Sequence, residues 1–134
     1  MSPEVKLYKD LKKNTPNILW NRIENLSLLG MPDLLGYNKK KHFFTLELKV
    51  AKGNKIKFSP HQIAWHISHP QSTFIMVKTL DPSTPKTYSV SLYRGSSIKA
   101  LVRDGVKTDP LACGFSACSS IFEDVGLTLE NLGV

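Results

Sequence analysis

The chain has 134 residues, which suffices for one compact domain and is too short for two of ordinary size. Hydrophobic residues make up 41% and charged residues 22%, and these proportions exclude an intrinsically disordered chain. The 18 lysines and arginines exceed 11 acidic residues, so the formal net charge is +7, and no stretch approaches the roughly 18 apolar residues that span a membrane.

The excess positive charge is concentrated in residues 39–57. This stretch holds 7 lysines and the single acid Glu47, a net charge of +6, whereas residues 1–38 sum to +1 and residues 58–134 to zero. A basic block on a folded domain indicates a polyanionic partner, with nucleic acid favoured over an acidic membrane. A solvated surface that keeps the protein soluble is the alternative interpretation.

The first predicted elements are a helix and three strands. Ser2-Pro3-Glu4 opens a short helix, because proline is tolerated in the first helical turn, and residues 13–17 end it. Strands are expected over residues 18–25 and 33–37. The clearest strand covers residues 42–50, because apolar and polar side chains alternate along it. Its apolar face consists of Phe44, Leu46, Leu48 and Val50.

A second helix and two further strands follow the basic block. Ser59 and Pro60 predict the start of a helix that Pro70 ends, since serine is a good N-cap and proline fits the first helical position. Strands are expected over residues 73–80 and 87–93. The remaining expectations are a short helix over residues 96–102, an irregular segment over residues 105–118, and a closing helix or docked tail built on Phe122, Val125, Leu127, Leu129 and Leu132.

This order of elements predicts a single α/β domain over residues 1–134, with helices packed on a sheet. The motifs described below fall in residues 18–80, and residues 95–134 are expected to form a C-terminal extension that packs on this core. Met1-Ser2-Pro3-Glu4 lacks the apolar segment of a signal peptide, so a cytoplasmic location is expected. No membrane partner and no nucleotide cofactor are expected.

Three acidic residues and one lysine are placed to converge at one edge of the sheet. Asp33 begins one predicted strand, and Glu47 and Lys49 share the polar face of another. Glu24 lies 9 residues before Asp33, on a strand with its own polar face. If these strands are neighbours, the carboxylates and the ammonium group lie close together.

Such a set of side chains suits the hydrolysis of a phosphodiester. Carboxylate oxygens bind Mg²⁺, which lowers the pKa of a bound water and neutralises charge on the phosphate, and Mn²⁺ is expected to substitute. A lysine beside the metal can orient or deprotonate the attacking water, or stabilise the phosphorane. The metal and Lys49 would also offset the repulsion between the gathered carboxylates.

The sequence around these residues resembles the PD-(D/E)XK nuclease superfamily. The signature consists of Gly30-Met31-Pro32-Asp33-Leu34-Leu35 and Thr45-Leu46-Glu47-Leu48-Lys49, with 13 residues between the two acids. Arg22-Ile23-Glu24-Asn25 precedes it, and Ser59-Pro60-His61-Gln62 with Trp65 follows it. These additions are similar to the small VRR-NUC and phage-type nucleases, in which a Glu precedes the Gly-x-Pro-Asp element and a Gln opens the next helix.

The resemblance implies a restriction-endonuclease-like fold, with a mixed central sheet flanked by helices, and metal-dependent cleavage of DNA. By position, Asp33 and Glu47 would bind the metal together with the Leu48 backbone carbonyl, and Glu24 would add an acidic ligand, directly or through water. Lys49 would be the catalytic lysine, and Gln62 would order the site. VRR-NUC members are similar to Holliday-junction resolvases, which act as symmetric homodimers, so a homodimer is one assembly that the resemblance implies.

Further basic residues are candidate DNA contacts around this site. Lysines lie in two loops that are expected to border it, namely Lys39, Lys40 and Lys41 before the catalytic strand and Lys52, Lys55 and Lys57 after it. For the first loop a solvated hairpin tip is an equal alternative. Arg22 could contact phosphate or pair with Glu24, and His61 is a further candidate contact. His66 and His69 lie three residues apart and could in principle bind a metal, but no third ligand is evident, so positions on the helix surface or facing the substrate are favoured.

Three functions remain open from the sequence. The first is a Mg²⁺-dependent endonuclease that acts on branched or structured DNA, such as a junction or a flap. The second is a nuclease fold retained as a catalytically inactive DNA-binding module. The third is a small basic protein that binds an acidic partner protein. The small size of the chain fits a phage or mobile-element protein, which would act in the host cytoplasm.

Overall fold

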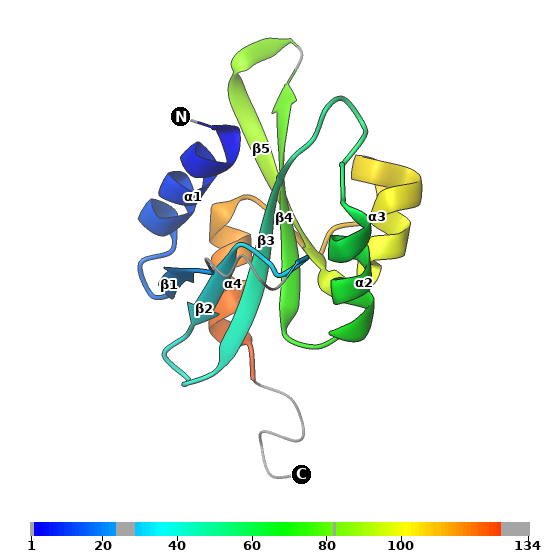
Figure 1. Cartoon of the computed structure of the whole chain (residues 1–134). Helices are drawn as coiled ribbons and strands as arrows, with labels where there is room; N and C mark the ends of the chain where they lie inside the picture. The colour runs from blue at the N-terminus through cyan, green and yellow to red at the C-terminus, as the bar shows by residue number, and fades with distance from the viewer. Residues whose placement is uncertain (1, 24–28, 82, 127–134) are drawn as a thin grey trace.

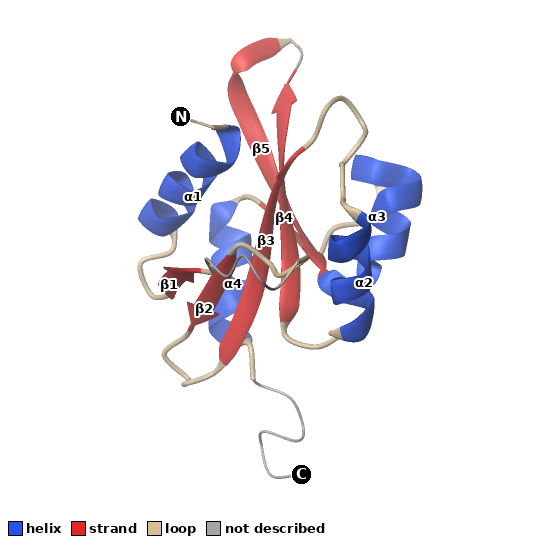
Figure 2. Cartoon of the chain, in the orientation of Figure 1, coloured by secondary structure: helices blue, strands red, loops and turns tan. Residues whose placement is uncertain are grey.

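The computed structural model describes residues 2–23, 29–81 and 83–126, and it has three layers (Figure 1). A six-stranded sheet lies between two pairs of α-helices, and short 3₁₀ turns cover Gly95–Ser97 and Gly105–Lys107 (Figure 2). The helices and strands are α1 (Pro3–Asn14), β1 (Leu19–Arg22), β2 (Leu34–Tyr37), β3 (Phe43–Val50), α2 (Pro60–Ser68), β4 (Thr73–Asp81), β5 (Thr84–Arg94), α3 (Ile98–Asp104), β6 (Ala112–Cys113) and α4 (Phe115–Asp124).

The strands lie side by side in their order along the chain, from β1 to β6. All neighbouring strands are antiparallel except β3 and β4, which are parallel. Parallel neighbours cannot be joined by a tight turn, and α2 provides the crossover between them. The sheet is therefore mixed and flanked by helices, as predicted for a single α/β domain.

The two predicted helix starts are confirmed in atomic detail. The hydroxyl of Ser2 accepts a hydrogen bond from the Val5 N–H at 3.2 Å, which caps α1. Ser59 caps α2 in the same way, with Pro60 at the first helical position and Gln62 completing a reciprocal capping box. The start of α2 is thus set by local chemistry, and this determines where Gln62 lies.

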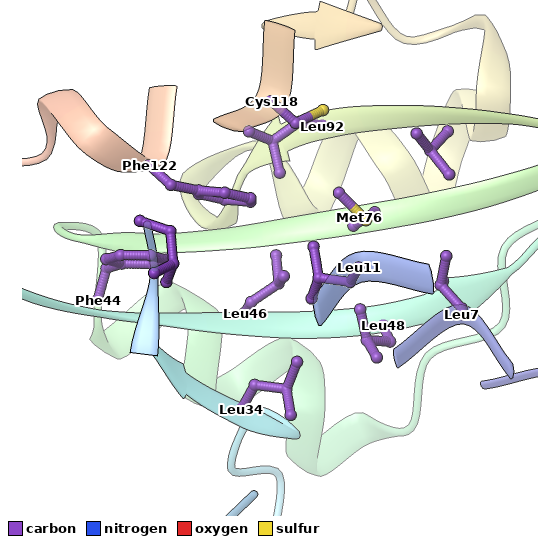
Figure 3. Close-up of a cluster of buried hydrophobic side chains, with 12 residues drawn as sticks. Leu7, Leu11, Leu34, Phe44, Leu46, Leu48, Met76, Leu92, Cys118 and Phe122 are labelled. Carbon is purple, nitrogen blue, oxygen red and sulfur yellow. The ribbon is translucent and has the colours of Figure 1, made fainter. Parts of the chain in front are cut away.

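The larger core lies on the sheet face that α1 and α4 cover. It brings together the alternate residues of β3 with leucines of α1 and with Cys118 and Phe122 of α4 (Figure 3). Phe44 and Phe122 stack, with ring centroids 5.1 Å apart and an interplanar angle of 8°. A second, smaller core lies between the other face of the sheet and the helices α2 and α3.

The C-terminal part of the chain differs from the sequence-based expectation. Residues 105–118 were expected to be irregular, but they form a 3₁₀ turn, the short strand β6 and the first turn of α4. Phe115, Cys118 and Phe122 recur at helical spacing, but the serines between them mask the pattern, and packing on the sheet decides the outcome. The predicted contributions of Leu127, Leu129 and Leu132 lie outside the described residues.

The first strand also differs from its expected length. It was expected over residues 18–25, but β1 ends at Arg22, and residues 24–28 are not among those described. Within the described residues, none of the helices has the length and apolar character needed to cross a membrane.

We expect Phe122→Ala to destabilise the protein by about 3–5 kcal/mol, because it empties a ring-sized space in the larger core. Urea denaturation followed by circular dichroism measures this free energy of unfolding. Leu19→Ala is the control, since Leu19 is 66% exposed, and it should cost less than about 1 kcal/mol. Equal effects of the two substitutions would contradict the assignment of α4 to the core.

Candidate active site

Asp33 and Glu47 meet where β2 begins. Asp33 directly precedes β2, and its Oδ2 accepts a hydrogen bond from the Leu48 N–H of β3 at 2.8 Å. Glu47 is on the same strand as Leu48 and is only 2% exposed, whereas Asp33 is open to solvent on one side. The two carboxyl groups are close enough for the charge of Asp33 to raise the pKa of Glu47. The structure thus brings together the two carboxylates that the sequence singles out.

Gln62 links Lys49 to Glu47. The Lys49 Nζ donates a hydrogen bond to Gln62 Oε1 at 2.9 Å, and Gln62 Nε2 donates one to Glu47 Oε1 at 3.0 Å. The Ser59 N–H also donates to Gln62 Oε1 at 3.0 Å, as part of the cap of α2. The side chain that begins the helix therefore also orders the site, and Lys49 is held on the same sheet face as Glu47.

Gly30 allows the segment before Asp33 to lie against the first turn of α2. Its φ is +85°, a conformation that favours glycine, and a Cβ atom there would collide with the backbone carbonyl of His61. No larger residue fits this approach. Gly30 therefore contributes to the site by placing Asp33 close to Gln62.

The site carries an unbalanced buried carboxylate. Glu47 Oε2 has no hydrogen-bond partner in the described part of the chain. Burial, and then the charge of Asp33, raise the pKa of Glu47 to about 9, and the Lys49 ammonium opposes this shift. Removal of its carboxyl from water also raises the pKa of Asp33, against the hydrogen bond from Leu48. Without a further positive charge, the pair tends to keep a proton.

The residues present fit a divalent cation. The Asp33 and Glu47 carboxylates supply oxygen ligands, and the unpartnered Glu47 Oε2 leaves one of these oxygens available. The Leu48 N–H points to Asp33, and in a strand the carbonyl of the same residue faces the same edge. Across residues 2–23, 29–81 and 83–126, no cluster of three or more His, Cys, Asp or Glu side chains forms. The predicted ligand Glu24 lies outside these residues.

Glu4 is a further acid near the site that the sequence did not indicate. Its charge raises the pKa of Asp33, and its side chain lines the same cleft as Lys49 and Gln62. In the sequence, an acid in a first helical turn after Ser-Pro is adequately explained by the helix dipole. Only the packing of α1 against β3 shows its proximity to Asp33.

The two lysine-rich loops lie at opposite ends of β3 (Figure 1). Lys52, Lys55 and Lys57 follow β3 and line a cleft together with Lys49. Lys39, Lys40 and Lys41 precede β3, so the expectation that both loops border the site holds for one loop only. The β2–β3 turn lies at the start of β3, whereas Glu47 lies in the second half of this strand.

Lys40 has a structural contact instead. Its Nζ donates to the carbonyl of Glu123 at 2.9 Å and to the carboxylate of Asp124 at 2.8 Å, which joins the β2–β3 turn to the end of α4. Lys40 therefore contacts the end of α4 and not the candidate site.

The other candidate contacts are distributed over both faces. The Arg22 guanidinium lies 5.9 Å from the ring centroid of Tyr8, on the face that α1 covers and away from Glu47. His61 is exposed in the first turn of α2, beside Gly30. His66 is fully buried, so its expected position on the helix surface or facing the substrate is wrong. Burial lowers the pKa of His66 to about 4, which keeps the ring neutral at pH 7.

Comparisons of the chain with models of known protein families, with curated proteins and with solved structures found no match. The function therefore has to be inferred from the residues of the site themselves.

The raised pKa of Glu47 predicts how stability depends on pH in the absence of metal. The folded protein binds the proton of the Glu47 carboxyl group more tightly than the unfolded chain does. Protonation of Glu47 therefore stabilises the fold fully below about pH 4.5, and this stabilisation is lost as the pH rises through about 9. We expect the free energy of unfolding in EDTA to fall over this window, by up to roughly 1 kcal/mol per pH unit. Urea denaturation across the pH range measures this fall.

Glu47→Gln should flatten the pH dependence and stabilise the metal-free protein at pH 8, because the amide carries no charge to bury. Asp109→Asn, which changes an exposed carboxylate, should keep the wild-type slope. A Glu47→Gln variant with an unchanged slope would show that Glu47 does not hold the proton.

Proposed function

We propose that the chain is a metal-dependent endonuclease of the PD-(D/E)XK type, which hydrolyses phosphodiester bonds in branched or structured DNA such as junctions or flaps. The observation that carries this proposal is the buried Glu47 carboxylate, which has one oxygen without a partner and lies beside Asp33 and the Lys49–Gln62 pair. A buried acid of this kind is costly unless a cation balances it.

Asp33, Glu47 and the Leu48 carbonyl are the groups that would hold Mg²⁺, or Mn²⁺ in its place. When bound, the ion supplies an acidified water and neutralises charge that develops on the phosphate. The protein provides a rigid frame for this set, because Asp33 is fixed by the Leu48 N–H and Glu47 by Gln62.

Lys49 is the group that would assist the attack on the phosphate. Gln62 holds its ammonium, and the Phe58 ring lies 4.9 Å from it. In this position Lys49 can orient the attacking water or stabilise the phosphorane. In its neutral form, the Lys49 amine can also accept a proton from that water. A positive charge held beside two carboxylates also limits the repulsion between them.

The basic loop after β3 supports DNA as the substrate. Its lysines line a cleft together with Lys49, so the polyanion would meet positive charge near the carboxylates. The mixed sheet with flanking helices is also what the resemblance to PD-(D/E)XK nucleases implies.

We expect purified protein to cut junction or flap DNA with Mg²⁺ or Mn²⁺, and Glu47→Gln, Asp33→Asn and Lys49→Met each to lower the rate at least about 100-fold. DNA binding in EDTA should persist in Glu47→Gln and Asp33→Asn, because these substitutions keep all the lysines of the cleft. Lys99→Met and Asp109→Asn alter exposed residues and are the matched controls. Glu47→Gln protein that cuts at the wild-type rate would contradict the mechanism. Salt-sensitive binding without cleavage in either metal would favour the inactive DNA-binding module.

Metal binding should be visible without DNA. At pH 8, saturating Mn²⁺ should raise the melting temperature of the wild type by about 5 °C, because the ion binds the folded state alone. Differential scanning fluorimetry measures this shift. Glu47→Gln should show little or no shift, and Asp109→Asn should respond as the wild type does. An equal rise in wild type and Glu47→Gln would place the metal elsewhere.

A further inference from the structure

A cleft of about 1050 Å³ extends from the candidate active site along the loop between β3 and α2. Lys49 and Gln62 line it, and Gln62 donates a hydrogen bond to Glu47, so the cleft lies next to the Asp33–Glu47 site. Pockets for a single small ligand usually have about 300–1,000 Å³, so this cleft has room for more than one nucleotide.

The basic wall of the cleft is built in place. The backbones of Lys52 and Lys55 pair with each other at 2.9 and 3.0 Å, which closes a tight turn. Asn54, inside that turn, accepts a hydrogen bond from the Val106 N–H at 3.0 Å and donates one to the Asp104 carbonyl at 3.2 Å. The loop is thereby fixed to the end of α3.

The lysine side chains of this loop face outward, whereas the residues that flank them are buried. Ala51 and Ile56 are 8% and 7% exposed and belong to the smaller core. Within the described part of the chain, the ammonium groups of Lys52, Lys55 and Lys57 make no ion pair or hydrogen bond. A group of unpaired positive charges on a fixed loop suits the phosphates of a nucleic-acid strand.

Besides the lysines, the cleft is lined by apolar side chains and by the polar residues Glu4, Ser59 and Gln62. Phe58, Pro60 and Val102 belong to its apolar part, and Val102 is 50% exposed, so this part is open to a ligand. A stacked duplex presents its sugars and phosphates to such a cleft and would leave these side chains uncovered. Bases of an unstacked strand would cover them while its phosphates meet the lysines.

We infer that this cleft binds single-stranded DNA next to the bond to be cut, so that the substrate carries a single-stranded flank on the Lys49 side. The inference rests on the proposed nuclease function for the position of the cut, but the binding that it claims requires no cleavage. Among structured DNAs, this inference predicts that flaps and splayed ends are better substrates than fully paired junctions.

The test measures binding of the full chain in EDTA, by fluorescence anisotropy, to a 15-nucleotide thymidine strand and to a duplex of the same length. Lys52→Gln with Lys55→Gln removes two charges from the cleft, and Lys9→Gln with Lys13→Gln removes two exposed charges from α1 as the matched control. We expect the single strand to bind more tightly than the duplex. The cleft variant should raise its Kd about tenfold and lower the salt slope by about 1.4, while the control stays within twofold.

A second readout tests the apolar wall. A strand that carries a fluorescent 2-aminopurine base at successive positions should be quenched at one or two adjacent positions, and Phe58→Leu should relieve that quenching. Thermal melting of each variant confirms that it is folded. Tighter binding of duplex than of single strand, or a cleft variant that binds as the control does, would overturn the inference.

The two proposals fail separately. If cleavage requires Glu47, but the loss of Lys52 and Lys55 changes neither cleavage nor strand binding, single-strand binding by the cleft is contradicted. The proposed nuclease function would still be supported. If single-strand binding depends on these lysines, but the protein cuts nothing with Mg²⁺ or Mn²⁺, the proposed nuclease function is contradicted. Single-strand binding by the cleft would still be supported.

Discussion

A buried carboxylate is the constraint on which the rest of the site depends. Glu47 lies on a central strand, under α2, with one oxygen bonded to Gln62 and the other without a partner in the described residues. A charge in such a place has to be balanced or neutralised by a proton. Asp33, Lys49 and Gln62 are arranged around it so that a cation, rather than a proton, would complete the set. The proposed reactivity of this site and the pH-dependent stability predicted for it therefore have the same physical origin.

The fold positions this set through the two connections of β3. Its antiparallel pairing with β2 delivers Asp33 to the Leu48 N–H, and its parallel pairing with β4 requires a crossover, which delivers Gln62 at the start of α2. The same crossover carries the lysine loop, so the basic wall and Gln62 are consequences of one connection. Gly30 closes the arrangement, since only glycine lets the segment before Asp33 approach α2.

Local patterns predicted much of this arrangement, and long-range packing supplied what they missed. Alternation along β3 identified the face of Glu47 and Lys49, and Ser59-Pro60 identified the start of α2. The position of Glu4 and the burial of His66 depend on which segments pack together, and no local signal reports that. The charge pattern alone likewise does not tell which of the two lysine loops borders the site. The loops lie at opposite ends of β3, and only the one after β3 lies beside Lys49.

The most direct test of the central claim is an anomalous difference map from crystals of the wild-type protein soaked in Mn²⁺. A metal-dependent site predicts an anomalous peak between the carboxylates of Asp33 and Glu47, on the side of the Leu48 carbonyl. Binding there would give Glu47 Oε2 the partner that it lacks. A map with no peak at this place, in crystals that accept Mn²⁺ elsewhere or not at all, would contradict the account.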